Sequence, residues 1–90
     1  MPSVSFTSNL KRFYPELSKM EISAKRVSDV LDLVEKAYPG LKDYVVDEHG
    51  RLRKHVNIFI GNDLVKDREH LSDEVLEDDQ VYIMQALSGG

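Results

Sequence analysis

Residues 27–40 read VSDVLDLVEKAYPG, and their apolar side chains repeat with the period of a helix. The apolar positions recur at steps of three and four, which places them on one stripe. They are Val27, Val30, Leu31, Val34, Ala37 and Tyr38. Polar and charged residues fall on the opposite side, and Pro39-Gly40 cannot continue the helix. The stretch therefore predicts one amphipathic helix that buries a single face.

Two stretches before this helix alternate apolar and polar residues, which is the period of a half-buried strand. They are Ser3–Thr7 and Lys19–Ala24. The segment between them, residues 9–18, is polar, contains Pro15 and is typical of a turn region. We therefore expect the two strands to form a hairpin.

Two stronger strands are predicted after the helix, at His55–Ile60 and Val81–Leu87. Shorter elements lie around them. Leu41–Val46 is read as a short helical turn or irregular segment, Leu64-Val65 as a short edge strand or loop, and Leu71–Leu76 as a single helical turn. The chain is thus a hairpin, a helix, and two strands separated by short elements.

A hairpin followed by a crossover helix and returning strands packs one sheet face against that helix. We place the last strand centrally, beside the first. The predicted fold is an α+β β-grasp (ubiquitin-like) roll, in which a mixed sheet of four to five strands carries one main helix on one face. The domain is predicted to span residues 1–86, with residues 87–90 as a flexible tail.

The chain of 90 residues has 12 basic and 16 acidic side chains, a formal net charge of −4. A nucleic-acid-binding protein needs a basic face to displace counterions from phosphates, so this balance argues against a nucleic-acid partner. Without cysteine the chain has no disulfide framework, thiolate zinc site or catalytic thiol. Its apolar runs are far shorter than the roughly 18 residues that span a membrane, and its N-terminus lacks a signal-peptide layout. We therefore expect a cytoplasmic protein with no membrane partner.

No group of side chains has the spacing of a catalytic or metal site. The histidines, His49, His55 and His70, lack the spacing of a helical zinc site and are expected to face solvent. The acidic residues between 73 and 79 are interpreted as a solvated face, with a docking patch for a basic partner as the alternative. The basic residues between 51 and 54 are interpreted as solvated turn charges. We predict no catalytic residue, no metal site and no bound cofactor.

Three large side chains are predicted to lie on the sheet face opposite the helix. Alternation along the two best strands points Phe59, Tyr82 and Met84 away from the helix. An uncovered sheet face is ordinarily polar, whereas aromatic residues and methionine are enriched in protein interfaces. These residues are therefore predicted to form a partner-binding surface. The alternative is that a loop such as Leu41–Val46 folds over them.

The chain ends in a short tail directly after its last predicted strand: Leu87, Ser88, Gly89 and Gly90. Glycine has no side chain, so such a tail can thread a narrow channel in another protein. A terminal carboxylate is ionised at neutral pH and can attack a phosphoryl group. We predict that a partner takes up the tail and modifies Gly90.

The order and spacing of four segments resemble the ubiquitin-like sulfur carrier proteins of the MoaD/ThiS family. The segments are AYPGL (37–41), VNIFIGN (56–62), DDQVYI (78–83) and ALSGG (86–90). The resemblance extends over residues 3–90. The segment VNI, the adjacent His55 and the length near 90 look closer to cysteine-biosynthesis-type carriers than to the shorter thiamine carriers.

This resemblance implies a carrier that works with partner enzymes and is not itself an enzyme. An E1-like (MoeB/ThiF-type) adenylyltransferase would use ATP and Mg²⁺ to adenylate Gly90. A sulfur donor would displace AMP and leave a thiocarboxylate, and a sulfur-accepting biosynthetic enzyme would receive the sulfur. Leu87, Ser88 and Gly89 would thread the adenylating enzyme.

Several alternatives remain open at this stage. Within the carriers, a cysteine-type pathway is favoured over the small subunit of molybdopterin synthase. A second class is a ubiquitin-like protein modifier, joined through Gly90 to lysines of target proteins. A third is an interaction domain whose tail has no chemical role.

Overall fold

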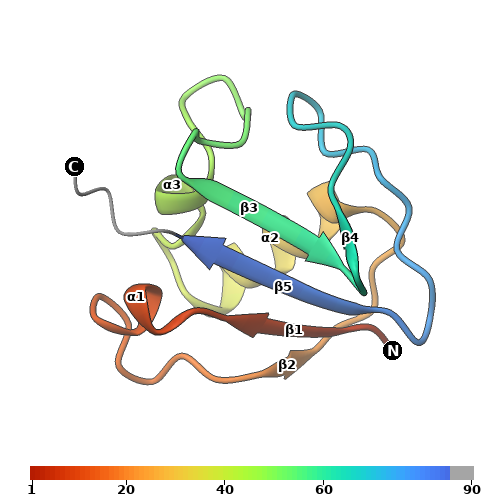
Figure 1. Ribbon diagram of the computed structural model, residues 1–90. Coiled ribbons are helices and arrows are strands. Elements are labelled where there is room, and N and C mark those ends of the chain that lie inside the picture. Colours follow the sequence, from red (N-terminus) through yellow and green to blue (C-terminus); the bar gives the residue numbers. More distant parts are fainter. Residues whose placement is uncertain (86–90) are drawn as a thin grey trace.

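The structure, a computed structural model, describes residues 1–85, which contain a five-stranded mixed sheet of order β2-β1-β5-β3-β4 (Figure 1). The strands are β1 (Ser3–Phe6), β2 (Met20–Glu21), β3 (Val56–Ile60), β4 (Asp63–Leu64) and β5 (Gln80–Gln85). β5 lies at the centre, parallel to β1 and antiparallel to β3. The predicted β-grasp roll, with its last strand beside its first, is confirmed.

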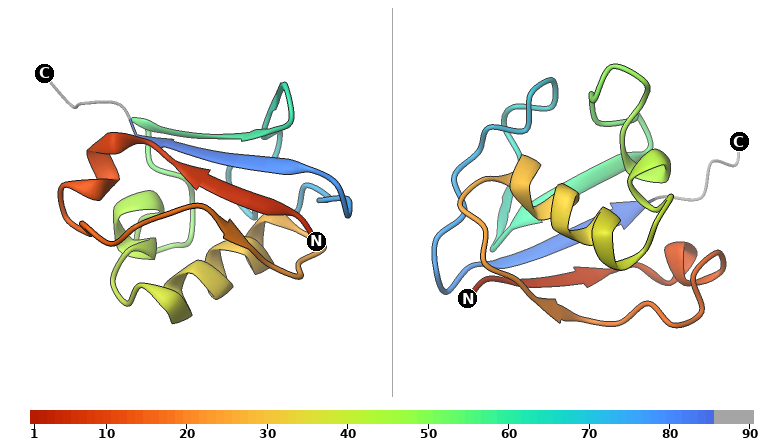
Figure 2. Two further views of the ribbon diagram at one scale, coloured as in Figure 1. Left: turned by 90° about the horizontal axis from the view of Figure 1, so that it is seen from below. Right: turned by 180° about the vertical axis from the view of Figure 1, so that it is seen from behind.

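The helices of the described residues are α1 (Ser8–Lys11), α2 (Val27–Ala37) and α3 (Lys42–Val45). Figure 2 shows α2 and α3 on the same side of the sheet. α2 buries the predicted stripe through Val27, Val30, Leu31 and Val34. The inner side of the sheet contributes Val4, Val56, Ile58, Val81 and Ile83, all at most 1% exposed. The core therefore lies between the sheet and α2, as the two periods predict.

The start of α2 is held by a distant loop. No side chain caps this end of the helix. Instead, the backbone N–H of Val27 donates to the carbonyl of Asp73 at 3.0 Å, and that of Ser28 donates to the carbonyl of Leu71 at 2.9 Å. Because the first N–H groups of a helix have no partner within it, these bonds fasten the loop around residues 71–73 to α2.

The end of α2 is held by Glu35. Its carboxylate accepts the backbone N–H groups of Gly40 at 2.8 Å and Lys42 at 2.9 Å, and these bonds lower the pKa of Glu35. Gly40 has φ +93°, and a Cβ there would lie 2.8 Å from the Tyr14 hydroxyl oxygen. Only glycine fits this turn without strain, and the turn carries the chain into α3.

The segment Leu71–Leu76 is not the predicted helical turn. It is irregular, apart from a bridge between Glu74 and Arg26. Within the segment, the N–H of Ser72 donates to the Asp67 carboxylate and the N–H of Val75 donates to the carbonyl of Lys25, so neither is available for a helical bond. The Asp67 carboxylate also accepts the backbone N–H groups of Glu69 and His70 just before the segment.

These bonds also shape the loop. The Ser72 hydroxyl donates to Asp67 as well, and together the bonds lower the pKa of the Asp67 carboxyl from 3.8 to about 2. Leu71 is held at φ +54°, a conformation that a leucine adopts only under constraint. Its side chain is nevertheless buried at 3% exposure, so the loop is anchored in the core.

The first hairpin also differs in extent from its prediction. β2 contains only Met20–Glu21, and α1 extends from Ser8 into the expected turn region. Leu10 of α1 is fully buried, and Leu17 is buried at 3% exposure, so this connection packs on the core. Because this connection is mostly polar and contains Pro15, its sequence does not indicate that it packs on the core.

Candidate functional site

The tail residues Leu87, Ser88, Gly89 and Gly90 lie outside the described residues, as does the predicted domain boundary at residue 86. The structure does show the strand that precedes the tail, as far as Gln85. β5 reaches Gln85 in the centre of the sheet, with β1 on one side and β3 on the other. The backbone N–H of Gln85 donates to the Thr7 hydroxyl oxygen at 3.2 Å. The strand before the tail is thus fixed on both sides.

A hollow of about 310 Å³ lies beside the end of β5. Asp43, Tyr44, Arg53, His55 and Gln85 line it. The side-chain nitrogen Nε2 of Gln85 is 3.4 Å from Nε2 of His55. The Arg53 Nε–H donates to the backbone carbonyl of Asp43 at 2.9 Å. The described part of β5 therefore ends beside a surface that the residues before β3 provide.

Arg68 holds that surface in place, a role that the sequence did not indicate. Its guanidinium donates to the Asn57 side chain at 2.8 Å and to the carbonyls of Arg53 at 2.7 Å and Val56 at 2.9 Å. A rigid fork of donors suits such a set of acceptors. Because Arg68 lies in a loop distant in sequence, no local pattern could have identified it.

The outer face of the sheet carries the three predicted side chains. Phe59 is the direct partner of Tyr82 in the β3–β5 register, and Met84 is the partner of Asn57. Tyr82 is 39% exposed, and Phe59 and Met84 are half-buried. Neither α2 nor α3 lies over this face (Figure 2). The predicted sidedness of β3 and β5 is confirmed; its use in binding a partner stays a prediction.

The alternative that Leu41–Val46 covers these residues is wrong. The segment contains α3, which lies on the side of α2 (Figure 2). Leu41 is fully buried, and Val45 and Val46 are buried as well. The apolar residues of this segment are thus part of the core.

Leu64 is a member of the outer face that the sequence analysis missed. It is the direct partner of Phe59 in the β3–β4 hairpin and is 52% exposed. Ser5, Tyr82, Phe59 and Leu64 therefore form one row across four strands. The signal was present: Gly61-Asn62 forms a two-residue turn, which pairs Ile60 with Asp63 and so Phe59 with Leu64.

The histidine predictions are correct for two residues. His49 and His70 are exposed, whereas His55 is half-buried beside Gln85. Among residues 1–85, no three side chains of the metal-binding types are grouped so that they could hold an ion. Within the same residues, no helix has the length and apolar character needed to cross a membrane.

The charged runs are only partly solvated. In the acidic run, Glu74, Glu77 and Asp78 are exposed, but Asp73 and Asp79 are half-buried. Asp73 accepts the backbone N–H groups of Lys66 and Asp67, and Asp79 accepts that of Leu76.

In the basic run, Arg51 and Lys54 are exposed, but Arg53 is half-buried. The prediction of purely solvated charges is therefore wrong for Asp73, Asp79 and Arg53. All three hold backbone groups of loops, a role that depends on the tertiary structure.

A protein-family model matches residues 4–90 and so includes both the sheet and the C-terminal Gly-Gly. It describes the ThiS family. The chain belongs to the ThiS family. Its members are small ubiquitin-like sulfur carriers with a β-grasp fold, and the resemblance inferred from the sequence is thereby confirmed. No curated protein matches this ThiS-family chain.

Solved structures share the fold over the whole length. A chain of the BexX/CysO complex of Amycolatopsis orientalis is 25% identical, with a TM-score of 0.84 and 100% coverage of both chains. CysO of Mycobacterium tuberculosis is 22% identical, with a TM-score of 0.82, covering 97% of this chain and 100% of that one. Small archaeal modifier protein 1 of Methanosarcina acetivorans is 24% identical, with a TM-score of 0.78, covering 99% and 95%. At such identities the last two show the fold alone.

Proposed function

We propose that this ThiS-family chain carries sulfur on Gly90, as a thiocarboxylate, for a biosynthetic enzyme of a cysteine-type pathway. The observation that carries the proposal is the family match, which continues from the sheet to residue 90 and so includes the Gly-Gly end. The central position of β5 supports it, because a strand fixed between β1 and β3 gives the tail a defined origin. In this proposal the partner enzymes supply the catalytic groups.

The proposed reaction has two steps at the carboxyl carbon of Gly90. First, a carboxylate oxygen attacks the α-phosphorus of Mg²⁺-bound ATP in an E1-like adenylyltransferase, and pyrophosphate leaves. Then hydrosulfide, or a donor equivalent to it, forms a carbon–sulfur bond while the bond to AMP breaks. AMP leaves with the bridging oxygen, and a thiocarboxylate remains. The carrier contributes position, because a tethered sulfur reacts locally in its acceptor enzyme.

The outer face is the proposed docking surface for the adenylating enzyme. Leu64, Phe59 and Tyr82 form a continuous row of large side chains across three strands, and Met84 lies next to it on β5. Aromatic residues and methionine are favoured in interface cores. Met84 lies one residue before Gln85, where the described part of β5 ends. A partner seated on this face would therefore be close to the tail that it receives.

Adenylation is tested directly by exchange of labelled pyrophosphate into ATP. The reaction contains the adenylating enzyme of the same organism, Mg²⁺, ATP and the carrier. We expect exchange that depends on the carrier and disappears when Gly90 is removed. Replacement of Gly89 by a bulky residue should also abolish it, since the tail would not enter a narrow channel. Exchange that persists without Gly90 would refute the proposal.

A protein modifier is the second candidate, because the fold is shared with small archaeal modifier protein 1. Both functions begin with adenylation, so the product separates them. Arg68 is the last lysine or arginine of the chain, and trypsin would therefore leave residues 69–90 attached to a target lysine. Finding that branched peptide in the host would support the modifier; its absence, together with a thiocarboxylate at Gly90, would support the carrier.

The pathway is tested by following the sulfur. Carrier loaded with heavy-isotope sulfide is incubated with an extract of its host, and the labelled small molecules are identified by mass spectrometry. The cysteine-type proposal predicts label in cysteine. Label in molybdopterin instead would identify the small subunit of molybdopterin synthase.

A further inference from the structure

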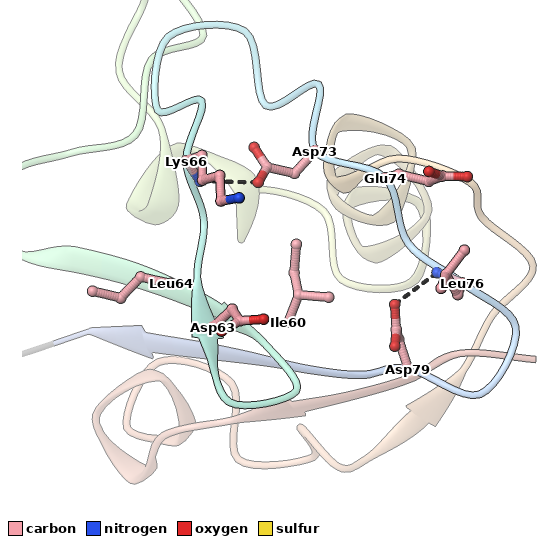
Figure 3. Close-up of a pocket in the computed structure, with 8 residues that line it drawn as sticks. All are labelled: Ile60, Asp63, Leu64, Lys66, Asp73, Glu74, Leu76 and Asp79. Carbon is pink, nitrogen blue, oxygen red and sulfur yellow. Dashed lines mark hydrogen bonds between the residues drawn. The ribbon is translucent and has the colours of Figure 1, made fainter.

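A second surface lies at the end of the sheet where β5 begins, away from the described end of that strand at Gln85. Between β4 and the segment 73–79 there is a groove of about 350 Å³ (Figure 3). Ile60 lies in its middle, with Asp63 of β4 on one side and Leu76 and Asp79 on the other (Figure 3). Leu76 is 59% exposed although it is a large apolar residue. The groove therefore presents apolar surface to solvent.

The charges along this groove are mostly negative. Asp63, Asp73, Glu74 and Asp79 line it, against the single cation Lys66. The ion pairs found within residues 1–85 are Lys42–Asp32, His49–Glu48 and His70–Asp67. None of these pairs includes a carboxylate of the groove. Arg26 forms a backbone bridge with Glu74, and Lys25 lies next to it in sequence. Neither of these cations is a member of those ion pairs, so neither is paired with a carboxylate of the groove.

The walls of the groove are built by specific bonds. Asp73 accepts the backbone N–H of Lys66 at 2.9 Å, which joins the segment after β4 to the opposite wall (Figure 3). Asp79 accepts the backbone N–H of Leu76 at 2.7 Å and fixes the turn before β5 (Figure 3). The remaining lining acids, Asp63 and Glu74, have exposed side chains. The structure thus divides the four acids into two that shape the groove and two that can meet a partner.

The groove and the described end of β5 lie at opposite ends of that strand. β5 begins at Gln80, beside the groove, and its described part ends at Gln85, at the far end of the same strand. Antiparallel pairing sets Ile60 of the groove against Val81, and Val56 against Gln85. A protein that contacts Gln85 therefore need not contact Ile60.

We infer that this groove docks a segment of a partner protein in which a bulky apolar side chain is flanked by lysine or arginine. The apolar side chain would lie against Ile60 and Leu76, and the cations would face Asp63 and Glu74. Complementary charge of this kind speeds association and sets orientation more than it raises affinity. The groove meets the outer face at Leu64, which lines the groove and also belongs to the row on that face. Its use does not depend on sulfur chemistry.

The probe is a blocked hexapeptide with four lysines around a central leucine pair, added to the isotope-labelled full chain. Two-dimensional NMR follows the backbone amides. We expect shifts confined to the groove, at Ile60, residues 63–66 and residues 73–79. Peptides with glycines in place of the leucines, or glutamates in place of the lysines, should bind at least tenfold more weakly. Equal binding of all three peptides, or shifts elsewhere on the sheet, would overturn the inference.

Matched charge variants separate docking from general attraction. Asp63→Asn with Glu74→Gln removes two charges from the groove without touching the acids that hold its walls. Glu77→Gln with Asp78→Asn removes two charges from exposed neighbours that do not line it. The first pair should weaken the lysine–leucine peptide about tenfold, and the second less than twofold. Equal losses would show that the peptide senses only net charge and would refute the groove.

Discussion

Ile58 and Phe59 are neighbours on β3, and they show how differently the two faces of one sheet are used. Ile58 is fully buried against the core, whereas Phe59 lies on the outer face between Tyr82 and Leu64. The same alternation on β5 buries Ile83 and leaves Tyr82 39% exposed. The inner face is occupied by the fold itself. The outer face keeps large side chains that α2 and α3 leave uncovered, which is why we assign it to a partner.

The largest expected effect is on the inner face. Ile58→Ala should lower the free energy of unfolding by about 2–5 kcal/mol, because it leaves a cavity between the sheet and α2. Denaturant unfolding followed by circular dichroism measures the change. A loss below about 1 kcal/mol would contradict the assignment of this face to the core.

A smaller, pH-dependent effect on the free energy of unfolding is expected at Asp67, which lies in the loop after β4 and on neither face of the sheet. The folded state lowers the pKa of Asp67 from 3.8 to about 2, so its carboxylate stabilises the fold fully above pH about 4. That contribution is lost as the pH falls toward about 2. Asp67→Asn should therefore be less stable than the parent at neutral pH, and the difference should shrink between pH about 4 and about 2. A difference in unfolding free energy that stays constant over this range would contradict the loop geometry.

On the outer face we expect a small effect on stability and a large one on function. Phe59→Thr should cost no more than about 1 kcal/mol, because threonine keeps a high strand propensity and only cross-strand contacts are lost. In the pyrophosphate-exchange assay, the same variant should need a higher carrier concentration for half-maximal rate. Ser5→Thr, in the same row but without a large side chain, is the control. Loss of stability comparable to that of Ile58→Ala would show that Phe59 belongs to the core.

The smallest effect on stability is expected at the end of the chain. Removal of Gly90 should leave the unfolding midpoint unchanged, since the domain is held by the sheet and α2. It should nevertheless abolish adenylation. A lowered midpoint would mean that the terminal residue contributes to the fold.

The fold was predictable because the apolar residues of its central helix and strands repeat with clear periods. The 3.6-residue stripe of α2 and the alternation of β3 and β5 identify the buried side chains directly. The outer face follows from the same alternation. Leu64 could have been added from the two-residue turn at Gly61-Asn62.

The remaining parts depend on contacts between segments distant in sequence. Arg68 binds the residues before β3, and a loop at Leu71 and Asp73 caps α2. In the expected helical turn, the N–H of Ser72 bonds to the Asp67 carboxylate and that of Val75 to the carbonyl of Lys25, so the segment is irregular. In a single sequence Asp67, Arg68 and Asp73 look like ordinary surface charges, since their partners come together only on folding.

The most direct test of the account is the intact mass of the chain purified from its own host, beside a chain from which Gly90 has been removed. We predict a population heavier by the difference between one sulfur and one oxygen atom, with the added mass on the last residue in fragmentation. The shortened chain should lack this population. If the full chain keeps its unmodified mass while the host's adenylating enzyme is active, the proposed sulfur carriage is contradicted.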